Sequence, residues 1–185
     1  MQRPKIMLGK GKKPNILIIG TPGTGKTSLS KKLAEKLEGY KRIELSKAIK
    51  KHTLYKKWDD KMGASIFDES LVRRYLKNKL DKYNSKNVGI ILDFHSVNFL
   101  KKKWFDIVFC LNSETHILFD RLEKRGYSQD KIKENVECEI FKVIRYDAAE
   151  IFDDEQIVDL QSNNTHEQRS NIKLILNKIS SIQNT

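Results

Sequence analysis

Cysteine is scarce in this sequence, with two among 185 residues. Cys110 falls in an apolar run that predicts a buried strand, Cys138 falls in a predicted helix, and no metal-ligand spacing links them. We therefore expect two reduced structural thiols and no disulfide framework. Long apolar runs are lacking too: none approaches the ~20 residues of a membrane span, and the basic N-terminus has no apolar signal segment. The sequence thus predicts an intracellular, soluble protein.

Acidic residues are fewer than basic residues: the sequence has 24 Asp and Glu and 36 Lys and Arg, which gives a net charge of +12. Lysines cluster in residues 10–13, 47–57 and 101–103. Such an excess suggests an anionic partner, either RNA or an acidic protein surface, because nucleotide phosphates need only a few cations. A solvated lysine-rich surface from a compositionally biased proteome is the alternative. Residues 1–13 lack periodicity and predict a flexible basic arm, followed by one domain over residues 14–185.

Glycine is also infrequent, but three of the nine glycines lie in residues 20–27, Gly-Thr-Pro-Gly-Thr-Gly-Lys-Thr. This stretch fits the phosphate-binding pattern of Gly, four residues, then Gly-Lys and Ser or Thr. Glycines let successive backbone N–H groups approach phosphate oxygens closely. Lys26 adds a positive charge for the outer phosphates, and the Thr27 hydroxyl at a helix N-terminus is placed to ligate Mg²⁺. The pattern predicts a bound nucleoside triphosphate.

The segments around this loop predict an α/β fold with a parallel five-stranded sheet flanked by helices. Strands are expected at residues 16–19, 40–45, 88–93, 107–111 and 157–160, and the intervening segments have helical periodicity. The stretch from residue 52 to 66 breaks the pattern. It is polar, carries aromatic residues and is too long for a simple connection, so we expect a functional loop.

A carboxylate ends the predicted strand over residues 88–93. In a parallel sheet ligands lie beyond the C-terminal strand ends, so Asp93 should face the phosphates and hold Mg²⁺ together with Thr27. An aspartate that merely caps a turn is the alternative. His95 follows two residues later. Its neutral imidazole would position a water or a phosphate, or would simply bond to a loop carbonyl.

A guanine-reading motif is mimicked by Asn-Lys-Leu-Asp at residues 78–81. These residues lie inside the helical periodicity of residues 67–83, whereas a GTPase presents this motif on a loop after a strand. The sequence therefore argues against a regulatory GTPase.

Two arginines follow the strand at residues 107–111. Ser113 is a plausible N-cap for the next helix, and Gly126 is a helix stop. Arg121 and Arg125 lie four residues apart and should share one helix face, where they suit closure over a triphosphate. A pair of surface arginines is the alternative. A polar link over residues 127–133 and a helix marked by residues 140–151 predict a small lid.

These motifs together resemble the adenylate kinase isoenzyme 6 family, also described as coilin-interacting nuclear ATPases. The resemblance runs from about residue 14 to the C-terminal helix. Its most specific parts are Pro-Asn-Ile at residues 14–16 with the Gly-Thr-Pro-Gly-x-Gly-Lys loop, Asp-Phe-His at 93–95 followed by Trp104-Phe105, Arg-Leu-Glu-x-Arg-Gly-Tyr at 121–127, and Glu-Cys-Glu-Ile-Phe at 137–141. Ordinary adenylate kinases share the phosphate loop but lack the Asp-aromatic-His segment and this short lid.

The resemblance implies a P-loop nucleoside monophosphate kinase fold, with a monophosphate-binding insert near residues 44–67 and a lid near 124–134. ATP contacts are implied for Gly23, Thr24, Gly25, Lys26, Thr27, Ser28 and Arg125. From the residues themselves we expect catalytic roles for Lys26, Asp93, His95 and Arg125. Many adenylate kinases place an arginine on the monophosphate, whereas this insert offers Lys50 or Lys51, a point charge that would hold AMP more loosely.

The family is described as combining adenylate kinase and ATPase activities with a role in maturing the small ribosomal subunit. The resemblance therefore implies ATP and Mg²⁺, an acceptor that is AMP, dAMP or CMP, a small-subunit ribosomal protein and RNA as partners, and a monomer in the nucleus and cytoplasm. An assembly ATPase for which AMP is incidental is the main alternative. An RNA-binding module with a vestigial nucleotide site is disfavoured, because Lys26, Thr27 and Asp93 are all present.

Overall fold

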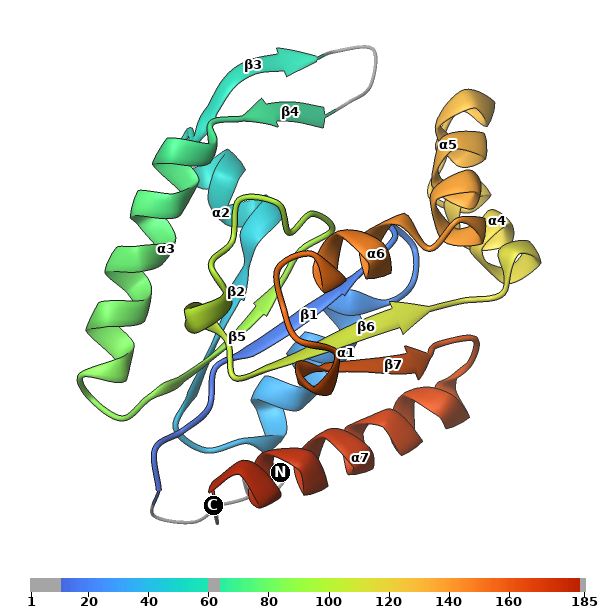
Figure 1. Ribbon diagram of the computed structural model, residues 1–185. Coiled ribbons are helices and arrows are strands. Elements are labelled where there is room, and N and C mark those ends of the chain that lie inside the picture. Colours follow the sequence, from blue (N-terminus) through green and yellow to red (C-terminus); the bar gives the residue numbers. More distant parts are fainter. Residues whose placement is uncertain (1–10, 60–63, 184–185) are drawn as a thin grey trace.

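The computed structural model describes residues 11–59 and 64–183. Its centre is a parallel sheet with the strand order β2-β5-β1-β6-β7 (Figure 1). The strands are β1 (Ile16–Gly20), β2 (Tyr40–Glu44), β5 (Gly89–Asp93), β6 (Ile107–Asn112) and β7 (Ile157–Gln161). Every residue of β1 and β5 is buried, as expected of strands that are covered on both faces. The predicted five-stranded parallel sheet is confirmed.

Helices cover both faces of this sheet and close two apolar cores. On one face, α1 (Lys26–Lys36) and α7 (Thr165–Gln183) bury apolar side chains against the sheet. On the other face lie α2 (Leu45–Lys51), α3 (Glu69–Asn84) and α6 (Val143–Ala149). The sequence 78–81 lies within α3, and Leu80 is buried there. This confirms that the guanine-motif match has no loop geometry.

A β-hairpin occupies the stretch that the sequence predicted to be an irregular loop. Strands β3 (Tyr55–Asp59) and β4 (Ala64–Phe67) pair antiparallel and extend from the body of the protein beside α3 (Figure 1). Phe67 anchors the base of the hairpin, because its ring packs edge-on against Phe94 at 5.7 Å and Phe99 at 5.1 Å between centroids. The loop prediction was wrong because lysines interrupt the apolar alternation by which strands are recognised.

The segment after β6 forms an arm of two helices. Helices α4 (Thr115–Glu123) and α5 (Gln129–Ile140) pack on one another around Leu118, Leu122 and Ile132. Helix α5 begins inside the predicted polar link, and it ends before α6 because Lys142 has a φ of 49°. The single helix predicted across residues 140–151 is therefore wrong.

Ser113 is not the N-cap of α4, since Glu114 occupies that position without a side-chain cap. The Ser113 hydroxyl instead donates to the Ser162 carbonyl at 3.0 Å. Two short 3₁₀ helices complete the described chain, η1 (Lys102–Trp104) and η2 (Asp154–Gln156). The basic arm predicted over residues 1–13 lies mostly outside the described residues.

Both cysteines are free thiols, as the sequence predicted. Burial raises the pKa of Cys110 to about 12, so this thiol stays protonated. Within the described ranges, no helix is long and apolar enough to cross a membrane.

Asn15 joins three segments at the N-terminal edge of the sheet, where it is almost fully buried. Its side-chain amide donates to the Trp104 carbonyl at 3.1 Å and accepts from the Ile90 N–H at 3.1 Å. Its backbone N–H donates to the Asp106 carboxylate at 2.6 Å. One side chain thus satisfies two buried backbone groups from different parts of the chain.

We predict that Asn15→Ala lowers the free energy of unfolding by roughly 2–4 kcal/mol, because it leaves a buried N–H and a buried carbonyl without partners. Urea denaturation followed by circular dichroism measures this change. Asn78→Ala, on the exposed side of α3, is the matched control and should change stability by less than about 0.5 kcal/mol. Equal effects of the two substitutions would contradict the role given to Asn15.

Candidate active site

The loop after β1 has a conformation that requires glycine. Gly20, Gly23 and Gly25 have φ values of 139°, 103° and 97°. A Cβ on Gly20 would lie 2.4 Å from the Leu111 carbonyl oxygen, and one on Gly23 would lie 2.5 Å from a Leu118 methyl group. The backbone can therefore turn tightly between β1 and the start of α1, where its N–H groups are available to an anion.

Thr24 supports this loop from inside. Its side chain is fully buried, and its hydroxyl donates to the Thr21 carbonyl at 2.8 Å. Thr24 is therefore the one predicted loop residue whose side chain is turned away from the cavity described next.

A cavity of about 450 Å³ lies over the loop. Its walls are formed by the phosphate loop, the segment after β5, α2, the end of β4, the turn between α4 and α5, and the first turn of α5. The lining residues are Pro22, Gly23, Gly25, Lys26, Thr27, Ser28, Ser46, Ile49, Lys50, Phe67, Asp93, Phe94, His95, Arg125, Tyr127 and Lys131. The structure thus brings together every predicted site residue except Thr24 and Arg121, and of the two candidate lysines in the insert it places Lys50, not Lys51, at the cavity.

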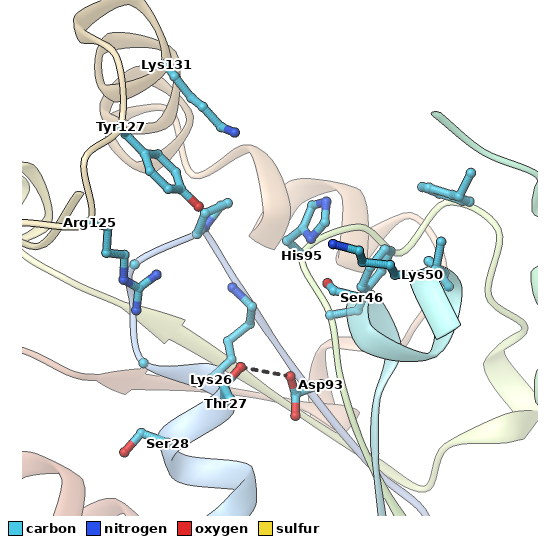
Figure 2. A pocket seen from close by; sticks show the side chains of 16 residues that line it. Lys26, Thr27, Ser28, Ser46, Lys50, Asp93, His95, Arg125, Tyr127 and Lys131 are labelled. Carbon is cyan, nitrogen blue, oxygen red and sulfur yellow. Dashed lines mark hydrogen bonds between the residues drawn. The ribbon is translucent and has the colours of Figure 1, made fainter. Parts of the chain in front are cut away.

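Polar and charged groups approach this cavity from two sides, as Figure 2 shows. Arg125, Tyr127 and Lys131 lie on one side, Ser46, Lys50 and His95 on the other, and Lys26 projects between them. The cavity therefore has two cationic ends that share one central lysine.

Lys26 folds back over the loop, where its ammonium group donates to the carbonyls of Gly20 at 2.6 Å and Thr21 at 3.0 Å. Burial at the base of the cavity is the largest influence on its pKa, and the Arg125 charge acts in the same direction. The Asp93 and Glu139 carboxylates offset part of this effect, and the net result lowers the pKa of Lys26 to about 8.

Asp93 reaches the loop because β1 and β5 are parallel neighbours, with Ile18 paired to Asp93. The Thr27 hydroxyl lies 3.3 Å from Asp93 Oδ1. The second oxygen, Oδ2, accepts from the Ser30 hydroxyl at 2.5 Å and from Arg42 Nε at 3.2 Å. One carboxylate oxygen is therefore held by protein, and the other faces Thr27.

Two of the residues that bind the Asp93 carboxylate, Ser30 and Arg42, were not identified from the sequence. Ser30 follows Thr27 by one helical turn, and Arg42 lies in the strand that neighbours β5, where it also pairs with Glu44 at 2.9 Å. An arginine inside a strand next to Asp93 was a usable signal, but only once the order of the strands is known.

Thr27 and Asp93 form an oxygen donor set that fits Mg²⁺. This ion prefers hydroxyl, carboxylate and phosphate oxygens, and it is commonly held by one or two carboxylates together with substrate phosphates and water. Asp93 Oδ1 and Thr27 Oγ1 are the two protein oxygens that lie at the loop in this way.

His95 presents a neutral ring to the cavity. The protein atoms around it, followed by the positive charges of Lys26 and Lys131, lower the pKa of His95 to about 4. The ring remains solvent-accessible and lies 4.3 Å from the Phe94 ring, centroid to centroid. At neutral pH the imidazole can therefore both donate and accept a hydrogen bond.

Arg121 and Arg125 do not share a helix face. Helix α4 ends at Glu123, so Arg125 lies in the turn before Gly126 and lines the cavity, as predicted for an ATP contact. Arg121 instead donates to the carbonyls of Ser162 and Asn163, both at 2.7 Å. It therefore connects α4 to the end of β7.

Glu139 is a further residue that the sequence reasoning did not assign. Its carboxylate accepts from the Thr21 hydroxyl at 2.5 Å and from the Ser113 backbone N–H at 2.6 Å. This residue fastens the end of α5 to the phosphate loop. The available signal was its position in the Glu-Cys-Glu-Ile-Phe motif, which carries no information about its partner.

Comparison with known proteins first identifies the fold. The AAA domain family model matches residues 16–142. A solved structure of shikimate kinase from Bacteroides thetaiotaomicron superimposes with a TM-score of 0.61 at 18% sequence identity, covering 90% of this chain and 98% of that one. This likeness shows the fold alone.

Fold and site together define a kinase of the P-loop class. An adenylate kinase isoenzyme 6 homolog of Caenorhabditis elegans is 39% identical over 164 residues, which cover 89% of this chain and 88% of the relative. A homolog of the same name from Plasmodium falciparum is 40% identical over 182 residues, covering 91% and 96%. The chain belongs to the adenylate kinase isoenzyme 6 family, which confirms the resemblance seen in the sequence.

We predict that the affinity for an ATP analogue falls about tenfold between pH 7 and pH 9 at saturating Mg²⁺. We expect the ammonium form of Lys26 to bind phosphate, and the empty protein loses this proton as the pH rises through about 8. Binding above that pH must restore the proton and is therefore weaker. Calorimetric titration with a non-hydrolysable analogue measures the effect. Lys26→Gln should bind weakly with little pH dependence, and an unchanged pH slope in this variant would refute the assignment.

Proposed function

We propose that this protein transfers the γ-phosphoryl group of MgATP to AMP and forms two molecules of ADP. The supporting observation is that one cavity has cationic groups at both ends, Arg125 and Lys131 on one side and Lys50 on the other, with Lys26 and Asp93 between them. One end suits the triphosphate on its loop, and the other suits the phosphate of a second nucleotide.

The residues of the cavity have separate roles in this reaction. The loop N–H groups, Lys26 and Arg125 bind the triphosphate and offset the charge that develops on the transferring group. Thr27 and Asp93 would hold Mg²⁺, which neutralises phosphate charge when bound. Lys50 attracts the AMP phosphate as a point charge, which makes a looser contact than an arginine fork.

No catalytic base is needed for this transfer. An oxygen of the AMP phosphate is already ionised, and it attacks the γ-phosphorus while the bond between that phosphorus and the β–γ bridging oxygen breaks. ADP leaves from one side as ADP forms on the other, so no proton has to move. The main task of the protein is to align the two nucleotides and to exclude water.

Two parts of the chain are suited to excluding water. We assign the monophosphate-binding insert to residues 44–67, which contain α2 and the hairpin, and the lid to residues 124–134, which contribute Arg125, Tyr127 and Lys131 to the cavity. Both segments flank the same cavity from opposite sides, so their approach would enclose the nucleotides.

The experiment is an assay of ADP formation from ATP with and without AMP, dAMP or CMP. Acceptor-dependent turnover is expected, and Lys26→Ala should reduce it by at least about 100-fold, because it removes a charge at the transferring group. The matched control is Lys31→Ala on the exposed side of α1, which should keep the wild-type rate. Wild-type turnover by Lys26→Ala would contradict the mechanism.

A second function is favoured by the neutral His95 ring at the cavity and by the net charge of +12. In this proposal, ATP hydrolysis drives release of the protein from a small-subunit ribosomal protein during ribosome maturation, in the nucleus and cytoplasm, with the protein acting as a monomer. His95 would orient the attacking water, because a neutral imidazole can accept one of its protons.

His95→Ala should then reduce ATP hydrolysis without acceptor several-fold more than it reduces AMP phosphorylation, because only hydrolysis needs an oriented water. Phosphate release and ADP formation are measured on the same preparation. His116→Ala is the control, since that side chain is 71% exposed. Equal loss of both activities in His95→Ala would argue against a role in positioning water.

A further inference from the structure

The net positive charge of this protein comes from the first half of the chain. Residues 1–86 contain 23 Lys or Arg and 8 Asp or Glu, whereas residues 87–185 contain 13 and 16, which together make up the 36 and 24 of the whole chain. A lysine-biased composition would enrich both halves. The asymmetry therefore indicates a basic surface that binds an anionic partner, formed by the elements before β5.

Helix α3 carries three lysines in a row on one outer face, preceded by a tyrosine. Its C-terminal end is closed by Asn87 at a φ of 51°, with bonds from the N–H of Asn87 to Asn84 and from the N–H of Val88 to Tyr83. Helical geometry thus extends to Lys86. Tyr75, Lys79, Lys82 and Lys86 then follow the spacing i, i+4, i+7, i+11 on one face, about 16 Å long. We call these four residues the α3 basic face.

An aromatic pair lies at one end of this face. The rings of His52 and Tyr75 are 5.1 Å apart at an interplanar angle of 36°, and His52 is exposed. The Lys79 ammonium group lies 5.4 Å from the centre of the Tyr75 ring. Rings next to cations are the combination on which single-stranded nucleic acids stack their bases while their phosphates bind lysine.

The lysines of the α3 basic face are not neutralised by the protein. In the part of the chain that the structure describes, Lys79, Lys82 and Lys86 form no ion pair within 4.0 Å. Some cations elsewhere are compensated, as Arg145 is by Asp154 and Asp159. The charges of Lys79, Lys82 and Lys86 are therefore available to an external anion.

The basic N-terminal segment meets the other end of this face. Asn87, directly after Lys86, accepts a hydrogen bond from the Lys13 backbone N–H at 3.0 Å and donates to the Gly11 carbonyl at 3.4 Å. Lys12 is exposed beside this contact. The fold thus adds further lysines where the helix ends.

We propose that the α3 basic face, with His52 at one end and residues 11–13 at the other, binds single-stranded RNA. The lysines contact phosphates and the Tyr75–His52 pair stacks against a base. An acidic protein would use the same charges but would not need the ring pair. None of the residues of this face lines the nucleotide cavity, so the inference is independent of the proposed kinase reaction.

The test measures fluorescence anisotropy of a labelled, unstructured 20-nucleotide RNA between 50 and 200 mM KCl. The triple variant Lys79→Gln, Lys82→Gln, Lys86→Gln should weaken binding about tenfold or more and reduce the salt slope by about two, because three phosphate contacts are lost. Tyr75→Leu keeps the packing beneath the ring, and it should weaken binding about fivefold or more without changing the salt slope.

The matched control removes three cations from helix α7, as Arg169→Gln, Lys173→Gln, Lys178→Gln, all exposed on the opposite side of the sheet. It should bind RNA within twofold of the wild type. Adenylate kinase activity should persist in every variant, which shows that each is folded and tests the kinase proposal separately.

Three results would overturn the proposal. The first is that the wild type binds no RNA at micromolar protein in 100 mM KCl. The second is that the α7 variant weakens RNA binding as much as the triple lysine variant of α3 does. The third is that polyglutamate displaces RNA as effectively as unlabelled RNA does at the same charge concentration. Each would mean that this face has no preference for nucleic acid.

Discussion

The parallel pairing of β1 with β5 is the constraint on which the site depends. It places Ile18 opposite Asp93, so the strand that enters the phosphate loop and the strand that carries the carboxylate end at the same edge of the sheet. Because all five strands run in one direction, their C-terminal ends meet there, and ligands bind at that edge. The glycine backbone after β1 then leaves room for phosphates beside Asp93.

Charge at this edge is balanced by groups from distant parts of the chain. Arg42 from β2 and Ser30 from α1 hold one oxygen of Asp93, while Glu139 from α5 holds the first turn of the loop. The buried lysine at the centre has its pKa lowered to about 8, so the empty site is not optimised for its own stability. A buried ammonium group with a lowered pKa is expected at a site where a bound anion compensates its charge.

Much of the fold was predictable, because its signals are local. Buried parallel strands are continuous apolar runs, and those at residues 16–19, 88–93 and 107–111 were recognised as such. The hairpin β3–β4 was missed because lysines alternate with its apolar residues and its pairing is antiparallel outside the main sheet. Arg121 was misassigned for a different reason: spacing predicts a shared face only while the helix continues, and α4 ends at Glu123, between the two arginines.

The sequence by itself determined the phosphate loop, the run that ends in Asp93 and the excess of lysine, because each is a property of consecutive residues. Only the tertiary structure decided that Arg42, Ser30 and Glu139 support this site, that Lys50 and not Lys51 reaches the cavity, and that the lysines of α3 form one face beside the N-terminal segment. The physical reason is that these relations depend on the order of strands and on helix ends, which arise from packing over long separations in the chain.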